Sequence, residues 1–71
     1  MEKKNFKTEL WASKKGLTPL CEMNWYGLTD DEIKATARGI AIGMGLKYAH
    51  PLVIVYEVKE SGEKLAIYKC E

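Results

Sequence analysis

Apolar residues between positions 33 and 48 recur at spacings of three and four, the period of an α-helix with one apolar face. On a helical wheel, an arc of about 100° is the width of a core-facing stripe. That arc holds Ile33, Ala37, Ile40, Ala41, Met44 and Tyr48. The pattern therefore predicts one amphipathic helix.

The residues before this stripe predict where the helix begins. Thr29 stands at an N-cap position and Glu32 follows three residues later, which is the spacing of a capping box. Asp30 suits the positive end of the helix dipole, and Leu28 and Ile33 have the spacing of a hydrophobic staple. We expect the helix to span residues 30–46.

The predicted end of the helix is open to two interpretations. Gly45 is suited to a left-handed C-terminal cap. Alternatively, the helix runs to about Tyr48 before Pro51 forces His50 into an extended conformation.

Small residues mark a second strip of the helix, roughly opposite the core stripe. Ala35, Gly39 and Gly43 follow one another at intervals of four, flanked by Ile42 and Leu46. Glycine inside a helix costs about 0.5 to 1 kcal/mol relative to alanine, so two glycines suggest that another backbone comes close. Two interpretations remain: contact with a second helix, most simply that of a second copy, or close packing by another segment of this chain.

The residues after Pro51 form two β-rich runs, LVIVYEVK and KLAIYKC, separated by ESGE. Such runs predict a hairpin of strands 52–59 and 64–70 with a two-residue turn at Ser61 and Gly62. We expect the helix to cover a first face made of Leu52, Ile54, Tyr56, Val58, Leu65 and Ile67. The second face then stays open, and it carries Val53, Val55, Glu57, Ala66, Tyr68 and Cys70. A register slip of one residue would exchange the two faces.

The N-terminal third predicts a second hairpin. Along its first strand Phe6, Thr8 and Leu10 alternate with Lys7, Glu9 and Trp11. A short helix over residues 6–15, capped by Gly16, is the competing interpretation. With the hairpin, the order is ββαββ, an α+β domain with one helix and an antiparallel sheet of about four strands.

Length and composition limit the possibilities further. A chain of 71 residues supports one domain, 1–71, and a domain this small buries only about 60% of its unfolded surface. The charged N-terminus lacks a signal-peptide core and no window resembles a membrane span, which predicts a cytoplasmic protein. Cys21 and Cys70 have no zinc-site spacing and are expected to be free thiols, and we expect neither metal nor cofactor.

The sequence offers little that points to catalysis. His50 precedes a proline, and a thiol nucleophile would need that imidazole within hydrogen-bond reach of Cys21 or Cys70. The acidic residues 30–32 are explained by helix capping. We therefore expect no catalytic residue and no enzymatic activity.

Apolar surface left uncovered on a small domain is typical of an interaction site. We expect a protein-binding module that acts as a regulator or inhibitor, of the kind encoded by phages and other mobile elements, and works as a homodimer. Its candidate contact residues are Ala35, Gly39, Ile42, Gly43, Leu46, Val53, Val55 and Tyr68.

Nucleic-acid binding is the alternative function. Lysines concentrate near the N-terminus, where they could contact phosphates while aromatic residues stack on bases. Arg38 is the only arginine, which counts against specific base contacts. The candidate residues for this function, which also suit a protein partner, are Trp11, Lys14, Lys15, Trp25 and Tyr26.

Overall fold

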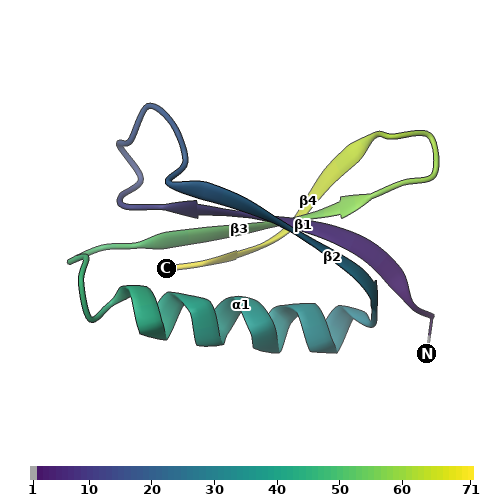
Figure 1. Cartoon of the computed structure of the whole chain (residues 1–71), viewed down its shortest axis with the longest axis horizontal. Helices are drawn as coiled ribbons and strands as arrows, with labels where there is room; N and C mark the ends of the chain where they lie inside the picture. The colour runs from purple at the N-terminus through teal and green to yellow at the C-terminus, as the bar shows by residue number, and fades with distance from the viewer. Residues whose placement is uncertain (1) are drawn as a thin grey trace.

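A four-stranded antiparallel sheet packs against a single helix in a computed structural model that describes residues 2–71 (Figure 1). The strand order is β2-β1-β3-β4, and α1 runs along one face of the sheet. The predicted ββαββ order and α+β class are confirmed. The elements are β1 (Lys4–Trp11), β2 (Cys21–Leu28), α1 (Asp30–Met44), β3 (Leu52–Val58) and β4 (Lys64–Cys70).

The N-terminal segment forms a hairpin, so the competing helix over residues 6–15 is wrong. β1 pairs with β2 on one side and with β3 on the other, both antiparallel. Phe6 and Thr8 are fully buried under α1, as their alternation with Lys7 and Glu9 predicts. The Thr8 hydroxyl remains satisfied because the Trp25 indole Nε1 donates a hydrogen bond to its Oγ1 at 3.1 Å.

The helix covers the face of β3 opposite to the one we predicted. Val53 and Val55 are 0% exposed and belong to the core with Ile33 and Ala37. The reason is the pairing of β3 with β1, whose apolar residues set the buried side. Thr8 lies directly opposite Val55, and directly opposed residues share a face of the sheet.

We call the side of the sheet covered by α1 the helix face and the other side the open face. The open face carries Ile54 and Tyr56 from β3 beside Lys7 and Glu9 from β1. These residues are half-buried, although no helix covers them. The open face is therefore a mixture of apolar and charged side chains.

The C-terminal hairpin differs from the prediction in its turn and in half of its register. Gly62 N–H donates to the Lys59 carbonyl, and Lys59 N–H donates to the Glu63 carbonyl, so three residues, 60–62, form the loop. Gly62 adopts a φ of +89°, the conformation that such a loop requires of its last residue. The predicted register holds from Val53 to Val55, and a β-bulge then shifts it by one residue.

The start of α1 follows the prediction, and its end does not. Thr29 Oγ1 accepts from the Glu32 N–H, and the Glu32 carboxylate accepts from the Thr29 N–H, which completes the capping box. The hydrogen bond that the Glu32 carboxylate accepts from the Thr29 backbone, followed by its interaction with the Thr29 side chain, lowers the pKa of Glu32. The helix ends at Met44 rather than at 46 or 48, and Gly45 has a right-handed φ of −62°.

Five of the six predicted stripe residues face the core, since Ile33, Ala37 and Ala41 are buried while Ile40 and Met44 pack against them. Tyr48, the sixth, lies beyond the end of α1. The helix packs mainly on β3, and less on β4 and β1. Within residues 2–71, no helix has both the length and the apolar character needed to cross a membrane.

Candidate functional site

The outer strip consists of Ala35, Gly39, Ile42 and Gly43 of α1 together with Leu46, which was predicted on the helix but lies in the turn after its end at Met44, and all five residues are on the surface. Ile42 is 75% exposed and Leu46 is 92% exposed. A Cβ added at Gly39 or at Gly43 would meet no atom within 4 Å. No segment among residues 2–71 therefore packs closely on these glycines, and the interpretation that they serve packing within the chain is wrong.

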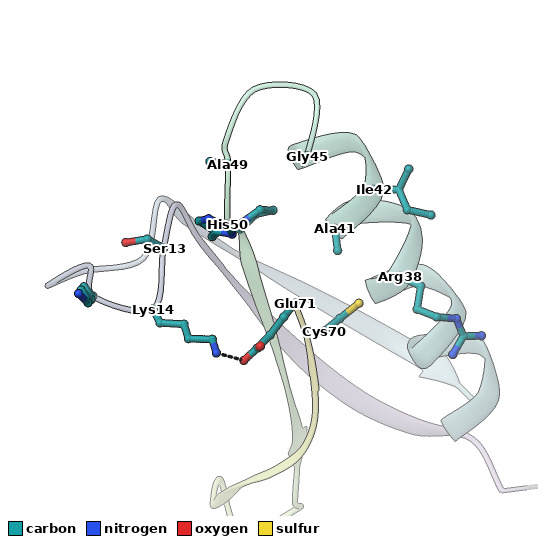
Figure 2. Close-up of a pocket in the computed structure, with 12 residues that line it drawn as sticks. Ser13, Lys14, Arg38, Ala41, Ile42, Gly45, Ala49, His50, Cys70 and Glu71 are labelled. Atoms are coloured by element: carbon teal, nitrogen blue, oxygen red, sulfur yellow. Dashed lines mark ion pairs between the residues drawn. The ribbon is translucent and has the colours of Figure 1, made fainter.

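A groove of about 860 Å³ lies beside this strip, between the C-terminal half of α1 and the end of β4 (Figure 2). Ala41 and Ile42 contribute from the helix, and Cys70 contributes from β4. Ala41 and Cys70 are directed toward the space between the two elements (Figure 2). Ala49 and Pro51, from the segment that links α1 to β3, complete the apolar lining.

The rim of the groove is positively charged. Lys14 and Lys15 reach it from the β1–β2 loop, and Arg38 reaches it from α1. Glu71 is the only acidic residue in the lining, and its Oε1 lies 2.8 Å from Lys14 Nζ. Lys15 and Arg38 form no ion pair with any of residues 2–71. The rim therefore carries two cations whose charge is not compensated nearby.

The groove also brings together two of the residues considered for catalysis. His50 and Cys70 both line it, but no hydrogen bond between them forms within the described chain, 2–71. Cys21 lies exposed on β2, at the other edge of the sheet. Three strand spacings of about 4.8 Å separate the two cysteine strands, beyond the reach of a disulfide.

Three of the predicted protein contacts do not lie on a free surface. Val53 and Val55 are buried beneath α1, so they cannot contact a partner in this fold. Tyr68 is half-buried on the helix face, where Lys34 Nζ lies 5.8 Å from the centre of its ring. The sequence of the hairpin places these three residues on one face but does not show which face is buried. The pairing of β3 with β1 decides this, because the apolar side of β1 faces the helix.

The residues considered for nucleic-acid binding are not assembled into one surface. Trp11 lies on the open face, where its Nε1 donates to Glu9 Oε1 at 3.3 Å, whereas Trp25 lies on the helix face. Tyr26 is 73% exposed on the edge strand β2. Lys14 and Lys15 lie at the groove instead.

Most of the N-terminal lysines are paired with carboxylates. Lys4 Nζ lies 3.5 Å from Asp30 and 3.6 Å from Glu57. Lys7 Nζ lies 3.0 Å from Glu22. Together with the pair between Lys14 and Glu71, these contacts leave Lys3 and Lys15 as the N-terminal lysines without an ion pair in residues 2–71.

Sequence reasoning identified the outer strip but missed the groove. The signal for the strip is contained in one helix, because it follows from spacing along α1. The groove depends on where β4 and the β1–β2 loop lie relative to α1, which no local pattern specifies. The only residue that could have indicated the groove from the sequence is Arg38, the single arginine of the chain, which lies beside the core stripe on the helical wheel.

The described residues, 2–71, contain no group of three or more His, Cys, Asp and Glu side chains arranged to hold a metal ion. Comparison with known proteins identifies no relative: no family, no curated protein and no solved structure matches the chain significantly.

Proposed function

We propose that this protein is a small, non-enzymatic, cytoplasmic protein-binding module, a regulator or inhibitor that acts by covering the surface of a partner and associates as a homodimer. The observation that carries the proposal is the outer strip of α1. Two large apolar side chains, Ile42 and Leu46, are exposed there beside two glycines that nothing in residues 2–71 covers.

The absence of side chains at Gly39 and Gly43 permits a second helix to approach closely. Helix axes pack at about 8 to 10 Å, and the distance depends on the side chains at the contact. In a two-fold dimer the same strip meets itself, so Ile42 and Leu46 of each copy cover the glycines of the other. This arrangement would bury the exposed apolar side chains and would offset the helix stability lost to glycine.

The proposal is tested by measuring solution mass with light scattering during gel filtration. The wild type should have about twice the 8.1 kDa mass of one chain. The double variant Gly39→Leu with Gly43→Leu should be a folded monomer, because the added side chains hold the two helices apart. Circular dichroism checks the fold, which these substitutions should not disturb since both positions are open to solvent.

The matched control is Gly39→Ala with Gly43→Ala, which raises helix propensity similarly but keeps the strip small. This variant should remain dimeric. A wild type that stays at 8.1 kDa over a wide concentration range would overturn self-association. A leucine variant that remains dimeric would show that the outer strip is not the contact.

A further inference from the structure

The groove between α1 and the end of β4 is separate from the outer strip, although Ile42 borders both. Its volume of about 860 Å³ falls within the range of roughly 300 to 1,000 Å³ that is typical of ligand-binding clefts. Its lining combines an apolar floor with a charged rim. This combination specifies the chemistry of an occupant more narrowly than an apolar surface alone.

The floor of the groove would accept a large apolar side chain. Ala41, Ala49 and Pro51 are small or rigid, and Cys70 closes the far side. An aliphatic or aromatic group seated among these residues would lose its contact with water, which favours binding by about 25 cal/mol for each Å² of apolar area buried.

The rim of the groove would accept negative charge beside that apolar group. Arg38 lines the groove from α1 and Lys14 lines it from the β1–β2 loop. The Arg38 side chain extends along the outer side of the helix, away from Lys14 (Figure 2). Lys14 is already held by Glu71, but Lys15 and Arg38 have no acidic partner within residues 2–71. The guanidinium of Arg38 can bind a carboxylate through two parallel hydrogen bonds.

We propose that the groove binds an acidic peptide segment of a partner protein, in which carboxylates flank a large apolar residue. A peptide fits better than a small molecule with a single carboxylate because the two uncompensated cations, Arg38 and Lys15, line the groove from two different parts of the chain, α1 and the β1–β2 loop. This inference rests on the proposed protein-binding function and adds the chemistry of the partner.

The test uses the full chain and a displayed library of random peptides. The selected peptides should carry at least two Asp or Glu residues around a Leu, Ile, Phe or Trp. Each is then synthesised and its affinity measured for Arg38→Glu and Lys15→Glu. Both variants should bind at least about tenfold more weakly than the wild type, because they reverse the charges that would meet the carboxylates.

Lys3→Glu provides the matched control. It changes the net charge equally and lies near the other end of α1, where its charge acts on Glu32. Affinity should be close to that of the wild type in this variant. Acidic peptides that bind Lys3→Glu as weakly as the groove variants would reveal only a general charge effect and would overturn the inference.

Two other outcomes would also overturn the inference. The first is a selection that yields no peptide or only peptides without acidic residues, and the second is peptides that bind Arg38→Glu and Lys15→Glu normally. Neither outcome changes the solution mass of the wild type or of the glycine variants. Failure of this inference is therefore distinguishable from failure of the proposed dimer.

Discussion

A single carboxylate, that of Glu9, accounts for much of the order on the open face. Its Oε1 accepts a hydrogen bond from the Tyr56 hydroxyl at 3.0 Å and another from the Trp11 indole at 3.3 Å. Two aromatic residues can therefore lie on an uncovered sheet face with their polar atoms satisfied. Burial, followed by the hydrogen bond to Glu9, raises the pKa of Tyr56 above the ordinary value of 10.0.

This shift predicts how stability changes in alkaline solution. Because the folded state holds the phenolic proton more tightly than the unfolded state, the contribution of Tyr56 is fully present below about pH 10. It is lost as the pH rises through the raised pKa. Urea unfolding from pH 9 upward, as compared with Tyr56→Phe, should show the wild type losing stability relative to the variant above about pH 10.

The effect of Glu9 on Tyr56 can be measured by titrating the phenol directly. The tyrosinate absorbance that disappears in Tyr56→Phe defines the titration of Tyr56. Its midpoint should fall toward 10.0 in Glu9→Gln and should not move in Glu60→Gln, a control in the exposed β3–β4 loop. An unchanged midpoint in Glu9→Gln would contradict the role of the carboxylate.

At the scale of elements, the orientation of β3 decides which of its two apolar faces packs against α1. Val55 is fully buried against α1, whereas its neighbour Ile54 is half-buried on the open face. Val55→Ala should lower the free energy of unfolding by about 2 to 3 kcal/mol, and Ile54→Ala by about 1 kcal/mol, although the second removes more carbon. Urea denaturation of both variants measures the difference. If Ile54→Ala cost more, α1 would cover the face that the hairpin pattern first suggested.

The elements that sequence analysis predicted correctly depend on local patterns. The capping box is contained in Thr29 to Glu32, and the alternation of β1 in Phe6 to Trp11. The main incorrect predictions concern the C-terminal hairpin, where the sequence allows two nearly equivalent arrangements. Both faces of the C-terminal hairpin are apolar, so only its pairing with β1 decides which one is buried. The bulge in β4 likewise follows from the three-residue loop and sheet twist rather than from composition.

For the whole molecule, the distribution of surfaces follows from having four strands and one helix. A 15-residue helix packs on β3, β4 and β1, and β2 extends beyond it. The outer side of α1, the groove beside β4 and the open face all remain accessible. A chain of this size exposes 4840 Å², of which an interface of standard size would cover about one sixth, or roughly 800 Å². If the proposals for the outer strip and the groove both hold, the exposed area is large enough for two partners, with Ile42 at the boundary between them.

The distribution of charged side chains over the molecule argues against nucleic-acid binding as the main function. Lys4, Lys7 and Lys14 are paired with carboxylates, so each would have to exchange a bound acidic group for a phosphate. Trp11 and Trp25 lie on opposite faces of the sheet and cannot stack on consecutive bases of one strand. We therefore expect no measurable affinity for a labelled single-stranded oligonucleotide at near-physiological salt.

Fluorescence anisotropy between about 50 and 200 mM salt measures this affinity, since phosphate contacts make binding weaken steeply over that range. Any weak binding at low salt should be lost equally in Lys3→Gln and in Lys15→Gln, because it would reflect general charge. Tight binding that persists at high salt and is lost only in Lys14→Gln and Lys15→Gln would instead place a nucleic acid at the groove rim. In that case the acidic peptide and the oligonucleotide would compete for the rim of the groove, and displacement of the labelled oligonucleotide by the peptide would show which of the two binds more tightly.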